Sequence, residues 1–318
     1  MRNGLTIAAA ALATVAAFAG PASAQGMKVG IGISGWTGFA PIILARDAGI
    51  FTKNGVDATI KMIPQTTRHI AIQSGDIQCA ATTVETWISW NAAGVATAQI
   101  FQMDKSYGAD GLAVRGDIKT IKDLKGKKVA AWSPGTAPYF LLSWFLKKNG
   151  LSIKDVSIVS LDPQGAANAF ITNQDISAAA TYEPYLSAVR AKPESGRIIA
   201  TTLDYPMVMD TFGCALAFLK GSRKTAEAIT KSYFEAVDMI KKEPRKSFGI
   251  MGAAVKQDAA AFEKSQSFLR WQDKASNQKF FGGEIQAFMK EAAALLLETG
   301  VIKSVPNLDA IVDASFVK

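Results

Sequence analysis

Histidine and cysteine are both scarce in this sequence. The 318 residues include one histidine, His69, and two cysteines, Cys79 and Cys214. One histidine cannot build a His-rich metal site, and it argues against a Ser-His-Asp catalytic triad. The two cysteines lie in apolar stretches, residues 77–81 and 214–218, so buried free thiols and a disulfide both stay open. We therefore predict no catalytic residues, no metal and no cofactor, and we interpret His69 as a structural residue.

Long apolar runs are absent after the first 24 residues. Residues 5–19 are apolar, Arg2 precedes them, and residues 22–24 follow with the small-residue pattern of a cleavage site. This order is typical of a secretory signal peptide, and the run is short for the ~20 residues that span a bilayer. No cysteine directly follows the run, which argues against a lipid anchor. The sequence thus predicts a cleaved signal peptide over residues 1–24 and a periplasmic protein.

A concentrated patch of one charge is also missing. The formal net charge is +8 at pH 7, but the basic residues are spread along the chain. The densest group is Lys125, Lys127 and Lys128, with apolar stretches on both sides, whereas nucleic-acid binding favours a basic stripe with interleaved aromatic rings. We expect no nucleic-acid partner, and we interpret the positive charge as a contribution to solubility.

The sequence does contain an alternation of apolar strands and helices with short connections, and this alternation occurs twice. Polar and Pro-containing helix starts, such as Ser133-Pro134, follow the strands. Such an alternation is typical of an α/β protein with a mostly parallel sheet and helices on both of its faces. The predicted strands are residues 28–33, 57–63 and 77–81 in the first unit, and 128–132, 156–161 and 176–181 in the second.

The pattern changes after residue 210. One more strand is predicted at residues 212–219, and three helices follow at 224–242, 258–272 and 283–299, because apolar residues recur there at helical spacing. A chain of this length tends to divide into two domains. Two α/β units and a helical tail therefore predict an α/β protein of two lobes.

Six short phrases along the chain resemble the nitrate/taurine-type (sulfonate) family of periplasmic solute-binding proteins of ABC importers. They occur in the order typical of that family and cover nearly the whole chain after the predicted signal peptide. The phrases are GWTGFAP at 35–41, ARDAGIF at 45–51, IQSGDI at 72–77, SYGADGL at 106–112, IKDLKGKKVA at 121–130 and YEPY at 182–185. The resemblance implies the type II periplasmic binding protein fold, in which two crossover strands join two α/β lobes.

The resemblance also implies a division of the chain and a set of partners. Residues 27–111 and 214–318, with the helical C-terminal tail, would form the first lobe, and residues 112–213 the second. The protein would be a monomer that captures a small-molecule ligand and delivers it to the inner-membrane permease and ATPase of an ABC importer. The strands of Cys79 and Cys214 could be neighbours in the family's strand order, which keeps a disulfide open.

The loops after the strands form the candidate ligand site, because ligands of open α/β sheets bind beyond the carboxyl ends of the strands. Free N–H groups at helix starts favour anions, so Thr82-Thr83 and Gly135-Thr136 are interpreted as a pair of anion-binding sites, one in each lobe. The predicted ligand-binding residues are Trp36, Thr37, Gln65, Thr82, Thr83, Glu85, Trp132, Gly135, Thr136, Tyr139, Gln164, Glu183 and Asp210.

Glu85 has two interpretations. Thr82 and Glu85 have the spacing of a capping box, in which the glutamate turns back to the start of its own helix, and on pattern alone this interpretation is favoured. The alternative is a contact between Glu85 and the ligand. Threonines at helix starts are likewise ordinary caps, which does not prevent Thr82 and Thr83 from binding a ligand as well.

Acidic and aromatic residues gather near the same loops. Acids such as Asp110 and Glu183 would repel a bare anion, whereas the ring of Trp36 can bind a cation. We therefore expect an amine-bearing sulfonate, such as taurine, or a related nitrogen compound. Alternatives are a guanidine/amidine-like or pyrimidine-type ligand, and a periplasmic sensor partner. An enzyme of the similar pyrimidine-synthase branch is disfavoured, because such enzymes carry clustered cysteines and an active-site histidine, and this chain has only His69 and no cysteine cluster.

Overall fold

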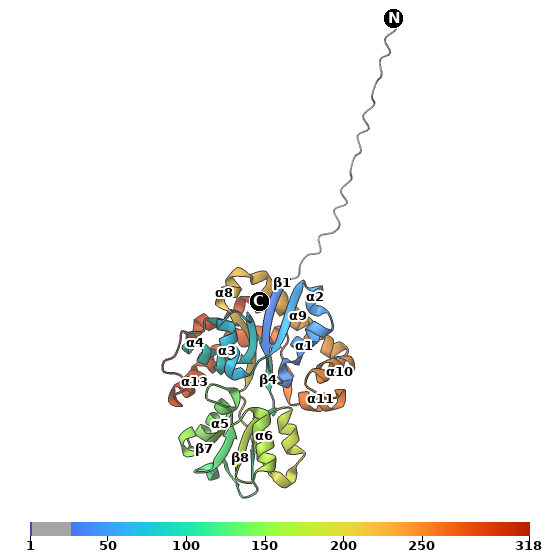
Figure 1. Cartoon of the computed structure of the whole chain (residues 1–318). Helices are drawn as coiled ribbons and strands as arrows, with labels where there is room; N and C mark the ends of the chain where they lie inside the picture. Colours follow the sequence, from blue (N-terminus) through green and yellow to red (C-terminus); the bar gives the residue numbers. More distant parts are fainter. Residues whose placement is uncertain (2–26) are drawn as a thin grey trace.

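The computed structural model describes residue 1 and residues 27–318. The predicted signal peptide, apart from Met1, lies outside the described residues. The rest of the chain forms two α/β lobes (Figure 1), and the chain enters the second lobe once and leaves it once. None of the helices in the described part of the chain is both long and apolar enough to cross a membrane.

The first lobe is built on a six-stranded mixed sheet. Its strand order is β11-β4-β10-β3-β1-β2, with β1 parallel to β2 and β3, and β10 antiparallel to β3 and β4. The strands are β1 Met27–Ile33, β2 Val56–Met62, β3 Cys79–Thr83, β4 Thr97–Ser106, β10 Met209–Ala215 and β11 Leu269–Trp271. Every residue of β3 is buried, as expected of a central strand covered on both faces.

The second lobe contains a five-stranded sheet with the order β7-β6-β8-β5-β9. Strand β6 is parallel to β7 and β8, and β5 is antiparallel to β8 and β9. The strands are β5 Asp110–Val114, β6 Lys128–Ala131, β7 Ser157–Ser160, β8 Ala178–Tyr182 and β9 Arg197–Thr201. In each sheet, a parallel unit is therefore joined to strands of the opposite direction, which carry the chain from one lobe to the other.

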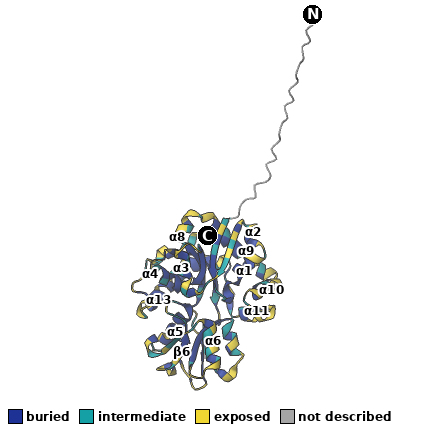
Figure 2. Cartoon of the chain, in the orientation of Figure 1, coloured by how far each residue is buried: buried dark blue, intermediate teal, exposed yellow. Residues whose placement is uncertain are grey.

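Helices cover both sheets, and their outward faces are exposed while the strands are largely buried (Figure 2). The first lobe has α1 Ala40–Asp47, α2 Ile50–Lys53, α3 Gln65–Gln73, α4 Val84–Ala92, α8 Leu216–Gly221, α9 Arg223–Lys242, α10 Pro244–Ala254, α11 Ala259–Gln266, α12 Lys274–Lys279 and α13 Ile285–Glu298. The second has α5 Ala137–Lys148, α6 Pro163–Thr172 and α7 Tyr185–Arg190. Single turns lie at Thr37–Phe39, Ile121–Leu124, Ile153–Asp155, Pro193–Ser195, Phe280–Glu284, Leu308–Ile311 and Ala314–Val317.

Two predicted elements have different limits in the structure. The strand predicted at 212–219 is β10, which ends at Ala215, and the apolar run continues into α8. The helix predicted at 258–272 ends at Gln266, and β11 then pairs with β4 at the edge of the first sheet. Both errors arise because a short apolar run has the same composition in a strand and in a helix.

Two segments connect the lobes, namely residues 106–110 and residues 201–209. Strand β5 belongs wholly to the second sheet and β10 wholly to the first. The limits 112–213 for the second lobe stay a prediction, and strand membership supports different ones. We propose that the second lobe comprises residues 110–201, because both ends of its sheet lie within this range.

A disulfide joins Cys79 of β3 to Cys214 of β10. The two residues are direct partners in the antiparallel register, and their Cα atoms are 3.9 Å apart. Both cysteines are fully buried, as the apolar stretches around them predicted. Of the two alternatives left open by the sequence, the structure has the disulfide and not the free thiols. Since β3 ends and β10 begins at the boundary between the lobes, the disulfide joins two of the strands that carry the candidate site.

Candidate functional site

Side chains from both lobes enclose a small cavity beyond the ends of the central strands. We call it the inner cavity, and its volume is about 20 Å³, little more than a water molecule needs. A wider outer cavity of about 220 Å³ shares Ser34 and Tyr182 with it. The inner cavity is lined by Ser34, Trp36, Phe39, Gln65, Arg68, Thr82, Thr83, Asp110, Ala137, Tyr182, Val208 and Asp210.

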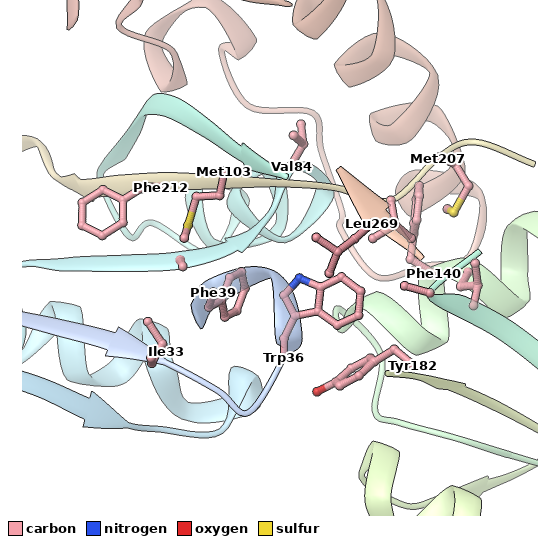
Figure 3. Close-up of a cluster of buried hydrophobic side chains, with 14 of the residues drawn as sticks. Ile33, Trp36, Phe39, Val84, Met103, Phe140, Tyr182, Met207, Phe212 and Leu269 are labelled. Atoms are coloured by element: carbon pink, nitrogen blue, oxygen red, sulfur yellow. The ribbon is translucent and has the colours of Figure 1, made fainter. Parts of the chain in front are cut away.

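Trp36 forms one wall of the inner cavity. It follows β1 and precedes the turn Thr37–Phe39, and its indole N–H points at the carboxylate of Asp104, with N–O distances of 3.3 and 3.4 Å. Its ring meets the edge of Tyr182 from the second lobe, with centroids 5.3 Å apart (Figure 3). A Cβ atom on Gly38 would lie 2.1 Å from Asp104 Oδ2, so the glycine makes room for this pair.

A network of hydroxyl and amide groups forms a second wall. The amide nitrogen of Gln65 donates to Thr82 and Thr86 at 2.8 Å each. The carbonyl oxygen of the same side chain accepts from the backbone N–H of Ala137, at the start of α5, at 3.2 Å. Gln65 therefore links the two lobes, and it occupies a helix N–H that the sequence had suggested for an anion.

Arg68 is the only lysine or arginine among the described residues that line the inner cavity. Its guanidinium donates to the backbone carbonyls of Ile63 and Ala81. Burial lowers the pKa of Arg68 to about 10, although Tyr182 and Asp210 act in the opposite direction. A Cβ atom on Gly32 would lie 3.1 Å from the Arg68 side chain, so β1 leaves space for it.

Four buried carboxyl groups surround this region. Asp110 and Asp210 line the inner cavity, and Glu85 and Asp104 lie behind them; each is at most 2% exposed. Burial is the main cause that raises the pKa of Glu85 to about 8 and that of Asp110 to about 7. Burial and mutual repulsion also raise the pKa of Asp104 and Asp210 well above the usual range. The four groups thus act on one another as well as on the cavity.

The structure brings seven of the thirteen predicted ligand-binding residues to the two cavities. Trp36, Gln65, Thr82, Thr83 and Asp210 line the inner cavity, and Trp132 and Gln164 line the outer one. Seven residues of the inner cavity were not among the thirteen, and three of them, Arg68, Asp110 and Tyr182, carry titratable side chains. Asp110 and Tyr182 had a signal, since each lies at the end of a strand; Arg68 had none, because it lies within a helix.

Six predicted residues do not line either cavity. Glu183 forms an ion pair with Arg190 and accepts a hydrogen bond from the backbone of Ser187, so its carboxylate is used within the second lobe. The hydroxyl of Thr136 donates to Ser133 within its own turn. The other four are Thr37, Glu85, Gly135 and Tyr139, of which Gly135 is the most exposed.

The capping box predicted for Glu85 is not formed. Thr83 is the residue before α4, and no side chain caps the helix start. Both carboxylate oxygens of Glu85 are buried without a hydrogen-bond partner among the described residues. The favoured interpretation of Glu85 as a cap is therefore wrong, and its carboxylate is directed to the interior.

The titratable residues do not form a metal centre in the part of the chain that the structure covers. No group of three or more His, Cys, Asp or Glu side chains between residues 27 and 318 is arranged to hold a metal ion. The carboxyl groups next to the inner cavity instead surround a space bounded by aromatic rings. Such a site can bind a small solute by charge, hydrogen bonding and ring contact.

Comparison with known proteins gives a consistent family. The sequence profile described as NMT1/THI5 like matches residues 36–247, about two thirds of the chain. A Brucella abortus protein named as a binding protein is 26% identical over 53% of this chain and 52% of its own length. An Escherichia coli protein named as an aliphatic sulfonates-binding protein is 29% identical over 59% of each chain. The chain thus spans little more than half the length of these curated relatives.

A solved structure extends the comparison to the fold. The alkanesulfonate-binding protein SsuA of Xanthomonas axonopodis pv. citri, bound to MOPS, superposes with a TM-score of 0.78 at 18% identity. The superposition covers 92% of this chain and 99% of that one. It confirms the predicted type II periplasmic binding protein fold with two α/β lobes.

Proposed function

The chain belongs to the NMT1/THI5-like family, and from this we propose that it is the solute-binding subunit of an ABC-type importer. The resemblance noted in the sequence phrases is confirmed at the level of the family. The relatives carry names of binding proteins, in agreement with the prediction that this chain is not an enzyme. Its solute, partners and location are part of the proposal.

The observation that carries the proposal is the inner cavity, which neither lobe could form alone. Trp36 and Gln65 come from the first lobe, and Asp110 and Tyr182 come from the second. Gln65 bonds across the boundary to Ala137. A solute held there would join the two lobes, so that capture and lobe closure would be the same event.

We propose that the solute is a small organic nitrogen compound. An amine-bearing sulfonate of the taurine type would direct its amine to Asp110 and Asp210 and its sulfonate to Arg68. A related compound without an acidic end would use the carboxylates and Trp36 alone. In both cases the carboxyl groups at the cavity argue against a bare anion such as nitrate.

The remaining proposals follow from this role. The protein would work as a monomer in the periplasm, after export by the predicted signal peptide. It would deliver the solute to the permease and the ATPase of an importer in the inner membrane. Stimulation of that ATPase by the loaded protein, and not by the unloaded one, is the expected measurement.

A ligand screen tests the binding role. Taurine, simple alkanesulfonates, primary amines, amidines, guanidines and nitrate would be added to the purified chain while thermal unfolding and tryptophan fluorescence are followed. A ligand at 100 times its Kd stabilises the folded state by about 2.7 kcal/mol, which is several degrees for a chain of this size. If none of these compounds changes either signal, the proposed function is wrong.

A pair of variants locates the binding. Trp36→Ala should weaken binding of any compound found by the screen, because it removes a wall of the inner cavity. Leu297→Ala changes an exposed side chain of α13 and serves as the control. Equal affinities of the two variants would place the ligand elsewhere.

A further inference from the structure

We infer that the inner cavity selects a compact, planar organic cation of the guanidinium or amidinium class, held between Asp110 and Asp210 beside the ring of Trp36, and does not accept a taurine-like zwitterion. This inference rests on the proposed solute-binding function. It goes further by assigning the charge and shape of the solute. It also removes the amine-bearing sulfonate from the two alternatives given above.

Carboxyl groups outnumber basic groups around the cavity, and they hold protons more readily than exposed carboxyl groups because burial raises their pKa. Asp110 and Asp210 line it, Glu85 and Asp104 lie next to them, and Arg68 is the one cationic side chain of the described lining. Three more carboxyl groups than cations are thus gathered in a space closed to bulk water. Opposite charges attract most strongly in such a space, so a cation is the solute that best offsets the cluster.

Several acceptor atoms of this cluster have no donor within the described residues. They are Asp110 Oδ2 and both carboxylate oxygens of Glu85, all buried. Buried oxygens that lack donors are rare in proteins and cost free energy. Of these residues Asp110 lines the cavity, so a solute that carries N–H groups would supply a donor to its free oxygen.

Arg68, the one cation of the described lining, is already partly used. It donates its Nε–H and one N–H of each terminal nitrogen to the carbonyls of Ile63 and Ala81, and the charge of Asp210 acts on it as well. A sulfonate could use only the two remaining N–H groups, and it would share the cavity with Asp210 and Asp110. The two aspartates therefore repel the acidic end of a zwitterion more strongly than Arg68 attracts it.

Shape supports the same class of solute. The inner cavity is bounded by the rings of Trp36 and Tyr182, whose planes differ by 74°. Its volume of about 20 Å³ is smaller than such a cation needs, so the cavity must widen between the two lobes when the solute binds. A flat, delocalised cation can lie against an aromatic face while its N–H groups point sideways to carboxylates, which a compact ammonium group does less well. The bond from Trp36 to Asp104 holds the ring in place for this contact.

The outer cavity continues the same chemistry. Trp132, Tyr185 and Asp162 line it, together with Tyr182. Aromatic faces and one more carboxylate thus lie on the path from solvent to the inner cavity. No lysine or arginine lies among the described residues of this outer lining, so a cation would meet no like charge on entry.

Calorimetry in paired buffers tests the inference. Guanidinium, methylguanidinium and acetamidinium chlorides at sub-denaturing concentrations would be compared with taurine and ethanesulfonate, at pH 7.5 and equal ionic strength. A cation lowers the pKa of the carboxyl groups, so its binding should release protons, and the heat should depend on the buffer. A sulfonate would need neutral carboxyl groups, and its binding should take up protons.

Two carboxamide variants and a control identify the residues. Asp210→Asn and Asp110→Asn should each weaken binding of the cation by about 30-fold or more, whereas Asp175→Asn, at an exposed site of the second lobe, should not. Thermal unfolding without ligand checks that both variants fold. Because each removes a buried carboxylate from a crowded cluster, their melting temperatures at pH 8 should equal or exceed that of the parent chain.

The outcomes separate the inference from the function. Binding of the cations with proton release, lost in Asp210→Asn, supports both. Binding of taurine or ethanesulfonate with equal or higher affinity, or cation binding that survives both variants, overturns the inference and leaves a solute-binding protein. No binding by any compound of either set overturns both.

Discussion

The two lobes contribute unequally to the cavity that they share. The first lobe supplies Arg68, Asp210, Glu85 and Asp104, all of them buried, on helices α3 and α4 and strands β10 and β4. Among the cavity linings, the second lobe supplies one buried acid, Asp110 at the start of β5, and Asp162 of the outer cavity, with aromatic and small polar groups. Most of the buried charged groups therefore lie on one side of the boundary, whereas both lobes supply aromatic rings.

The two lobes differ in their covalent and polar contacts. The first lobe also carries the disulfide, which joins β3 and β10 at the ends of these strands remote from the cavity. It ties together the two strands that bring Thr83 and Asp210 to the site. The second lobe contacts this part of the site through bonds such as that of Ala137 with Gln65. Four predictions test this division, from the largest expected effect to the smallest.

Loss of the disulfide should have the largest effect. Replacing Cys79 and Cys214 by alanine opens a covalent loop with a sequence separation of 135 residues, and we expect the free energy of unfolding to fall by about 3–5 kcal/mol. Urea unfolding measures this change. Parent protein unfolded in the presence of a reductant is the control, since it loses the bond and keeps the sulfur atoms. An unchanged urea midpoint in both would show that the disulfide does not stabilise the first lobe.

Substitutions of Trp36 and Tyr182, the aromatic pair at the boundary, should lower ligand affinity by different amounts. Trp36→Phe leaves the buried Asp104 carboxylate without the indole donor, so we expect ligand affinity to fall by about tenfold. Tyr182→Phe keeps the ring of the second lobe and removes only a hydroxyl, and a loss below about threefold is expected. Titration calorimetry on both variants gives the comparison. A larger loss of affinity for the tyrosine variant would show that the second lobe contributes more to ligand binding than the first.

The buried acids should make the unliganded protein less stable at higher pH. The pKa of Asp110 is raised to about 7 and that of Glu85 to about 8, so the folded state holds protons that the unfolded state has released above pH 5. Stability is then greatest below the unfolded values and is lost as pH rises through 7 to 8. Between pH 5 and pH 8.5 the melting temperature should fall by about 3 °C or more.

Two comparisons strengthen this pH test. The fall should be smaller in Asp110→Asn, because one of the groups that titrate in this range is gone. It should also shrink when the solute is bound, if the solute is a cation. A melting temperature that is flat or rises over the same range would mean that these carboxyl groups are hydrated in solution.

Ion pairs between the lobes should have the smallest effect. Lys148 pairs with Glu291 at 3.1 Å, and Lys147 pairs with Glu298, both between α5 and α13. These side chains are about half exposed, so replacing both lysines by alanine should cost no more than about 1 kcal/mol per pair. Ligand affinity should fall slightly, and the difference should vanish at high salt.

A pair inside one lobe is the matched control for that experiment. Lys53 contacts Glu235 at 3.1 Å, with both residues in the first lobe. Lys53→Ala should therefore leave ligand affinity unchanged. If it weakens binding as much as the double variant does, the effect comes from overall charge and not from lobe closure.

The course of the chain was largely predictable from the sequence. Strands near 28–33 and 128–132 were placed correctly, because apolar runs between polar helix starts have a strong local signal. The end of β10 was not, because residues 212–219 are apolar through both a strand and a helix. The strand β11 was missed since only its partner β4, far away in sequence, determines it.

The site was predictable where it depended on strand ends. Trp36 follows β1, Thr82 lies near the end of β3 and Asp210 near the start of β10, and all three line the inner cavity. Glu85 and Arg68 were not predictable in the same way. The spacing of Glu85 matches a cap, but its orientation depends on the packing of α4. Arg68 lies within a helix, and Gly32 of the neighbouring strand leaves space beside its side chain.

The disulfide has one more consequence, for how the molecule would withstand proteases. The whole second lobe lies in the chain between Cys79 and Cys214. A single cut of the backbone anywhere between these residues would open a peptide bond without releasing a fragment. A nicked protein would keep its mass on a non-reducing gel and separate into two bands only after reduction. The second lobe can thus be cut and still be retained.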